Sequence, residues 1–320
     1  MERDYYHENT KLARKDRKLV EENYIQKQGK VGYCSVDATA HYSFDWSQNA
    51  KAPYSSQQAS QEYFITALKV YLFGIHNEAT REQLNFVLAE NEYLNKGING
   101  TLSMVFAGIM RFNRGEKHLK LTCDNAVGQN KNNATIQFCQ FLAKAGYYES
   151  VELNFMIVGH TKFSPDRGFA MIKKKYYKST VYCKEEFVEV VKKSSPAELN
   201  KVQCYEDGKG FQYLNIKGTL EKFFTKLFNI AKYHHFFFES SNLETIKTKE
   251  YVDSDWEEFD LLKTESGKRE KVIEEIRNLV FPILPPKPLS LERLKYIDKK
   301  IRPLLPKKYW NTLPLPNLRY

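Results

Sequence analysis

Three aspartates and one histidine stand where apolar runs of the sequence give way to polar residues, and these side chains can bind metal ions and phosphate. Asp45 lies at the end of "VGYCSVDATAHYSFDW", Asp124 ends "KHLKLTCD", and His160 ends "VELNFMIVGH". Asp166 follows in "SPDRGFAMIKKKYY", in the first turn of an expected helix. Because the carboxyl ends of neighbouring strands in an α/β sheet meet at one edge, we expect these side chains to lie close together.

Carboxylates that lie close together repel one another, and they remain ionised together when a cation lies between them. We therefore predict a two-ion Mg²⁺ or Mn²⁺ site held by Asp45, Asp124 and Asp166. Two such ions activate a water or a 3′-hydroxyl and stabilise the leaving oxygen during phosphodiester cleavage. His160 is predicted as a further catalytic residue that contacts a phosphate or a water near the ions.

Amide and lysine side chains cluster around the same three acids. Amides orient metal-bound waters or phosphate oxygens, and consecutive lysines after Asp166 offer contacts to DNA phosphates. Either Tyr176 or Tyr177, which follow these lysines, is expected to stack on a base. The predicted nucleic-acid-binding residues are Asn49, Asn125, Gln129, Asn130, Lys131, Asn132, Lys173, Lys174 and Lys175.

Each of these residues also has a structural interpretation. Asn132 or Asn133 would serve as the N-cap of the helix that follows. A carboxylate in a first helical turn, such as Asp166, is stabilised by the helix dipole by roughly 0.3 to 1 kcal/mol without any catalytic role. The three lysines at 173–175 would equally suit a solvated helix face, and His160 a structural histidine. The functional hypothesis rests on three acids sharing one topological position.

Composition places the chain in a broad class and suggests a partner. Its 320 residues are 42% hydrophobic and 28% charged, which is typical of a globular chain with a large core. The formal charge of +10 favours a polyanionic partner, and we expect nucleic acid, with DNA as the leading candidate. Five scattered cysteines without a CxxC pair indicate a reducing, intracellular compartment. No run approaches the roughly 20 apolar residues of a membrane span, so we expect no membrane partner. The oligomeric state is open, a homo-oligomer included.

The apolar patterns predict strands and helices in an order typical of a mixed α/β sheet with helices on its faces. The expected elements are a solvated helix at 8–28, a strand or strand pair at 31–46, a hairpin of 63–77 and 83–90, a helix at 98–112, a strand at 117–124, a helix at 134–150, a strand at 151–161 and a helix from 164. After residue 195 the pattern suggests a small hairpin of 201–206 and 211–216, a charged loop or mobile arm over 240–275, and a proline-punctuated tail with one short helix.

Three segments, "SFDWSQNAKAP", "CDNAVGQNKN" and "VGHTKFSPDRGF", together resemble a eukaryotic domain-of-unknown-function family associated with mobile elements. That family is similar to transposases with a ribonuclease H-like catalytic core. The resemblance covers about residues 15–315 and implies a five-stranded sheet with Asp45 on the first strand, Asp124 after the fourth and Asp166 at the start of a following helix. Asp166 stands where many transposases carry Glu.

The resemblance also implies a domain organisation and a leading function. The expected parts are a helical lead-in at 1–30, a ribonuclease H-like core at 31–195, and a mostly helical extension at 196–320 that packs on the core. The leading hypothesis is metal-dependent cleavage or strand transfer on DNA by a transposase-derived domain in the nucleus. The alternatives are a catalytically silent module that binds nucleic acid or protein, and a metallophosphoesterase. The last draws on "VGHT" and on Asp124 with Asn125, although Asp45 lacks the DxH pattern of that class.

Overall fold

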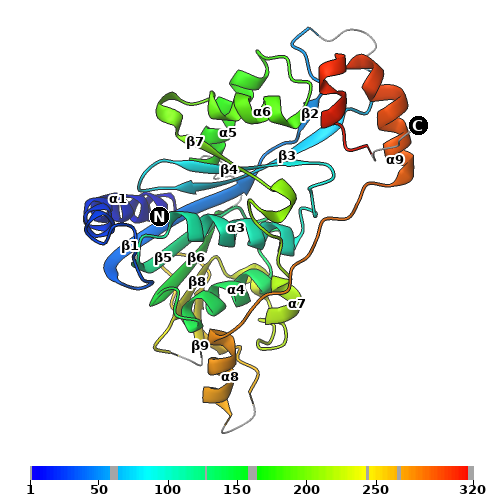
Figure 1. Ribbon diagram of the computed structural model, residues 1–320. Helices are drawn as coiled ribbons and strands as arrows, with labels where there is room; N and C mark the ends of the chain where they lie inside the picture. The colour runs from blue at the N-terminus through cyan, green and yellow to red at the C-terminus, as the bar shows by residue number, and fades with distance from the viewer. Residues whose placement is uncertain are drawn as a thin grey trace.

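A ten-stranded mixed sheet forms the centre of the computed structural model, which describes residues 2–57, 64–126, 128–157, 164–242, 245–264 and 268–315. Helices flank the sheet, as Figure 1 shows. The strands are β1 (Val36–Trp46), β2 (Ala50–Ala52), β3 (Leu68–Asn77), β4 (Gln83–Ala89), β5 (Glu116–Cys123), β6 (Ser150–Phe155), β7 (Asn200–Cys204), β8 (His235–Glu239), β9 (Thr245–Lys249) and β10 (Glu257–Asp260). The α-helices are α1 (Glu2–Gln26), α3 (Ile98–Phe112), α4 (Asn133–Lys144), α5 (Ser164–Tyr176), α6 (Lys184–Lys192), α7 (Ile216–Leu220), α8 (Arg269–Arg277) and α9 (Leu291–Tyr296).

The strand order is β10-β9-β8-β6-β5-β1-β3-β4-β7, and the short β2 pairs with β3. β1 runs parallel to β5, and β5 runs parallel to β6. β3 is antiparallel to β1 and to β4, so the predicted hairpin is confirmed. The mixed α/β class is likewise confirmed, although the sheet has ten strands rather than five.

Alternating residues of the central strands face two different layers. In β3, Phe73 packs into the large core beneath α3 and α4, whereas Leu72 packs with α5 and α6 on the opposite face. In β1, Tyr42 and Phe44 belong to the α3 and α4 side. His41, which lies between Ala40 and Tyr42 in the sequence, points to the opposite face and contacts α1.

The face of the sheet beneath α1 is unusually polar. The helix expected at 8–28 is present as part of α1, but it is not merely solvated, because Thr10 and Ala13 are buried. Tyr6 of α1 is buried and donates a hydrogen bond to Glu78 Oε1 at 2.5 Å. Ser43 also donates to Glu78 Oε1, at 2.7 Å. The fully buried His41 ring lies 2.9 Å from Thr122 Oγ1. These paired polar groups fix the position of α1 because leaving any of them unpaired in the interior would cost roughly 1 to 3 kcal/mol.

The chain after residue 195 differs from the sequence-based expectation. β7 adds to the edge of the sheet as a parallel partner of β4, and no hairpin forms with 211–216. Within 240–275, β9 and β10 extend the opposite edge and α8 begins, so the high charge of this segment belongs to exposed faces of regular elements. This extension therefore contributes strands as well as helices. The tail packs Ile297 and Ile301 against Leu68 at the start of β3.

No helix within the described ranges combines the length and apolarity that crossing a bilayer requires.

Candidate functional site

The parallel pairing of β1 with β5 brings the first two predicted acids to one edge of the sheet. The register joins Phe44 of β1 to Cys123 of β5, so the next residues, Asp45 and Asp124, occupy adjacent positions. Thr122 and Ser43, two residues earlier on each strand, face α1. Continued alternation places both aspartates on that same face.

Helix α5 brings the third acid to this face because two glycines let the helix lie close to β3 and β4. Gly74 is the antiparallel partner of Asp45, and a Cβ there would meet the ring of Phe169 of α5 at 2.8 Å. A side chain at Gly168 would likewise collide with Gln83 of β4. Asp166 lies in the first turn of α5, two residues before Gly168.

Ser164 fixes the start of α5 and links it to α1. Its hydroxyl donates to Glu78 Oε2 at 2.8 Å and lies 3.1 Å from the Tyr6 hydroxyl. Glu78, which directly follows β3, is completely buried and serves as a shared acceptor for α1, β1 and α5. This network sets where Asp166 lies relative to β1.

The three aspartates interact electrostatically. Burial, together with the neighbouring carboxylates of Asp124 and Asp166, raises the pKa of Asp45 to about 7. The backbone N–H of Trp46, which donates to Asp45 Oδ1 at 2.7 Å, opposes this rise, as does Lys96. A group of this kind, with an acid shifted toward neutrality by other acids, has the chemistry of a divalent-cation site.

The side chains as placed do not form a closed metal cage. In the part of the chain that the structure describes, no set of three or more His, Cys, Asp or Glu side chains is close enough to hold a metal ion. Asp166 is exposed, whereas Asp45 and Asp124 are half-buried. The residues therefore share an electrostatic environment, and their convergence within about 8 Å stays a prediction.

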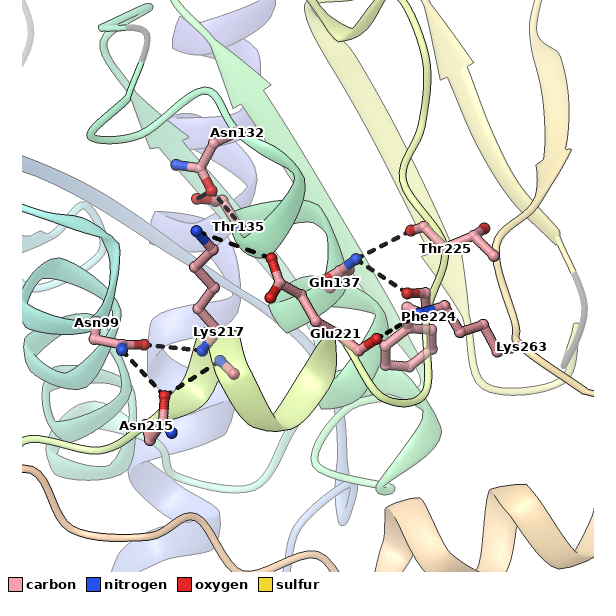
Figure 2. Close-up of polar contacts among 11 residues, drawn as sticks. Asn99, Asn132, Thr135, Gln137, Asn215, Lys217, Glu221, Phe224, Thr225 and Lys263 are labelled. Carbon is pink, nitrogen blue, oxygen red and sulfur yellow. Dashed lines mark hydrogen bonds and ion pairs between the residues drawn. The ribbon is translucent and has the colours of Figure 1, made fainter.

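The amides after Asp124 divide into two groups. Asn130, which is 1% exposed, donates a short hydrogen bond from Nδ2 to Asp124 Oδ1. Asn132 is the N-cap of α4 and accepts from the backbone N–H of Thr135 at 3.0 Å (Figure 2). The structural interpretation thus accounts for Asn132, while Asn130 fixes the carboxylate of Asp124.

Two amide oxygens beside Asp124 have no hydrogen-bond partner among the residues that the structure describes. They are Asn125 Oδ1 and Asn130 Oδ1, and both are buried. A buried acceptor without a donor is costly, so each oxygen suits a metal-bound water or a ligand that the protein alone does not supply. This observation is consistent with the donor set expected around Mg²⁺ or Mn²⁺.

The four lysines predicted to contact nucleic acid differ in their exposure. Lys174 and Lys175 are exposed on α5, and the half-buried Lys173 extends its Nζ to within 3.3 Å of Gln48 Oε1. Lys131 is 2% exposed and donates to Ala231 O at 2.9 Å, and burial lowers its pKa to about 8. It is therefore an internal anchor, contrary to the expected surface contact.

The remaining predicted residues lie at the periphery or outside the description. Asn49 is exposed between β1 and β2, and Gln129 is half-buried. Tyr176 is buried, stacks on Tyr54 at 4.2 Å and bonds to the backbone of Lys51, so it is not free to stack on a base. Tyr177 is exposed. His160 lies outside the described residues.

Sequence reasoning missed Lys96, a cation beside Asp45. Its ammonium lies 5.2 Å from the centroid of the Trp46 ring and 3.5 Å from Ser47 O. Burial lowers the pKa of Lys96, and the negative charge of Asp45 offsets only part of this shift. The loop "NKGING" carries no periodic pattern that would have revealed this contact.

Replacing Asp45 by Asn should stabilise the metal-free protein at high pH. The pKa of Asp45 is raised from 3.8 to about 7, so the folded protein binds the proton of this carboxyl more tightly than the unfolded chain does. The resulting stabilisation is complete below pH 4 and is lost as pH rises through 7. We expect Asp45→Asn to be more stable than wild type at pH 8, by up to roughly 4 kcal/mol, and the advantage to disappear near pH 4. Urea unfolding across this range in EDTA measures the difference, and a constant difference would contradict the shift.

Comparison with known proteins identifies a family without an assigned function. A family model described as "Domain of unknown function (DUF7869)" matches residues 60–254, which include Asp124 and Asp166. No curated protein matches the chain. Among solved structures, "Crystal structure of NurA" aligns with 8% identity and a TM-score of 0.18 over 85% of this chain. The chain spans 58% of that structure's length, and a likeness this weak carries no argument. The chain belongs to the DUF7869 family of domains of unknown function.

Proposed function

We propose that this protein is a metal-dependent phosphodiesterase acting on DNA, with a ribonuclease H-like core related to transposases. The observation that carries the proposal is the electrostatic coupling of Asp45 to Asp124 and Asp166, three acids contributed by β1, the exit of β5 and the start of α5. The three carboxylates repel one another in the folded protein, and a bound divalent cation removes that repulsion. We propose the nucleus as its compartment, because the resemblance to a eukaryotic mobile-element family implies chromosomal DNA as the substrate.

The topology of the central strands supports the ribonuclease H-like part of the proposal. Apart from the short β2, the first five strands stand in the order β4-β3-β1-β5-β6, with β3 antiparallel to its neighbours. Asp45 is then on the first of them and Asp124 follows the fourth, in agreement with the expected positions.

Each residue of the site has a distinct part in the proposed reaction. Asp45, Asp124 and Asp166 would hold the divalent ions, which when bound supply a nucleophilic water and charge stabilisation for the scissile phosphate. Asn130 orients the carboxylate of Asp124 through its hydrogen bond. Lys96, half-buried beside Asp45, would supply positive charge to a phosphate bound at this site.

A second candidate is a binding module that keeps the fold without cutting. The exposure of Lys174 and Lys175 on α5 favours it, because these cations can hold phosphates whether or not a metal is bound. DNA nicking, thermal stabilisation by Mn²⁺ and the salt dependence of duplex binding together separate binding from cleavage.

Cleavage should depend on Asp124. With Mn²⁺ present, wild-type protein is expected to nick supercoiled DNA, and Asp124→Asn should reduce the rate roughly 100-fold or more because one metal ligand loses its charge. Asp37→Asn is the matched control, since Asp37 is an exposed aspartate near the start of β1, at the sheet edge opposite to the exit of β5 that bears Asp124. Equal nicking by wild type and Asp124→Asn would refute the assignment, and no nicking by wild type would favour the binding module.

Metal should stabilise the fold through the same acids. Binding at about 100 times the dissociation constant stabilises the folded state by about 2.7 kcal/mol, which raises the melting temperature. We expect Mn²⁺ to shift wild type at pH 7.5 and to leave Asp45→Asn nearly unchanged, because that variant has lost both a ligand and the repulsion. Differential scanning fluorimetry measures the shifts, and equal shifts in both proteins would place the metal elsewhere.

Duplex binding should weaken as salt increases, with a contribution from α5. Each phosphate contact contributes roughly 0.9 to the slope of log affinity against log salt in B-DNA. The double variant Lys174→Ala/Lys175→Ala is therefore expected to reduce the slope by about 1.8, as measured by anisotropy titrations at several salt concentrations. An unchanged slope would make these lysines a solvated helix face.

A further inference from the structure

We propose that Phe228 is a stacking platform for an unpaired base of single-stranded DNA, at the sheet edge that also carries the acidic site; this inference rests on the proposed function. Phe228 is 85% exposed in the connection between α7 and β8. The neighbouring Leu227 is only 3% exposed, and Asn229 has a left-handed backbone with φ 54°. The chain therefore turns so that Leu227 points into the core while Phe228 points outward.

An exposed phenylalanine alone would mean little, because single apolar residues are common on protein surfaces. Phe64, for instance, is 82% exposed. What distinguishes Phe228 is that its loop, residues 225–231, is held by side chains from the segment that follows Asp124.

Three side chains of that segment hold the loop. Asn133 accepts from Leu227 N–H at 2.6 Å and donates to Leu227 O at 3.3 Å. Gln137 of α4 donates to Phe224 O at 3.4 Å and Thr225 O at 3.0 Å (Figure 2). Lys131 donates to Ala231 O at 2.9 Å, with its ammonium buried.

These contacts tie the loop to the acidic site through a short path. Asn130 holds the Asp124 carboxylate, and the next residue, Lys131, holds the loop. The loop is thus fixed against the element that carries Asp124, on both sides of Phe228 at Leu227 and Ala231. A ring already fixed in place loses little conformational freedom when a base stacks on it.

The charges around the ring suit a polyanion. Lys222 and Lys226 are exposed just before it, and Lys232 is exposed just after it, although Lys232 pairs with Glu257 at 2.6 Å. Aromatic rings interleaved with cations are typical of surfaces that bind single strands, where bases stack and lysines follow the phosphates. Stacking requires a base that is not enclosed in a duplex, so the partner is single-stranded DNA or a frayed end.

The test compares single-stranded and duplex binding in EDTA, so that cleavage plays no part. The probes are a fluorescently labelled thymidine oligonucleotide and a labelled hairpin duplex of equal length. The proteins are wild type, Phe228→Ala, Phe228→Trp and the control Phe64→Ala. We expect Phe228→Ala to weaken binding of the oligonucleotide about 10-fold, equivalent to ~1.4 kcal/mol, with the duplex affinity nearly unchanged. Phe228→Trp should retain the affinity, and Phe64→Ala should match wild type.

The outcomes separate this inference from the proposed function. Equal affinities of wild type and Phe228→Ala for the oligonucleotide would overturn the platform alone, as would an equal loss on both probes. Failure of wild type to bind either probe would instead refute DNA as the partner, and the platform with it. Because Phe228 is exposed, its replacement should leave the melting temperature unchanged, which confirms that any loss of affinity is local.

Discussion

The register between β1 and β5 is the constraint on which the candidate site depends. Parallel pairing of Phe44 with Cys123 places two acids at adjacent strand exits, where their charges repel. The apolar side chains that alternate with them, Tyr42 and Phe44 on β1 and Leu121 on β5, are buried in the core beneath α3 and α4. A shift of one residue would turn these apolar side chains toward the polar face beneath α1 and bury polar groups in their place, so core packing holds the acids together despite their repulsion.

Buried polar contacts carry the same constraint to the other face. Glu78 receives hydrogen bonds from Tyr6, Ser43 and Ser164, which belong to α1, β1 and α5. Breaking one bond in such a network leaves a buried carboxylate partly unsatisfied, so the three elements keep one arrangement. The face that bears the acids is thus fixed by directional contacts in addition to the apolar packing of α5 and α6, whereas the opposite face is fixed by apolar packing beneath α3 and α4.

Sequence patterns predicted the elements whose periodicity reflects burial on one face. The helix expected at 98–112 has those bounds in the structure, and the hairpin of β3 and β4 was found from its two apolar runs. The exit positions of Asp45 and Asp124 followed from the same strands. Their coupling to Asp166 depends on the close approach at Gly74 and Gly168, which is a property of the packed structure. Likewise, the burial of Lys131 and Tyr176 could not be predicted from the sequence, because both residue types are common on exposed helices and loops.

The topology of the sheet also determines when the site can exist during synthesis. β1, β3 and β4 form an antiparallel unit of neighbouring segments that can pair as soon as they leave the ribosome. β5 emerges later and docks on the free edge of β1, and α5 follows after β6. Asp45 therefore lies at an unpaired strand edge until Asp124 and Asp166 have been synthesised. A nascent chain cannot form the complete acidic group before most of its core has been translated.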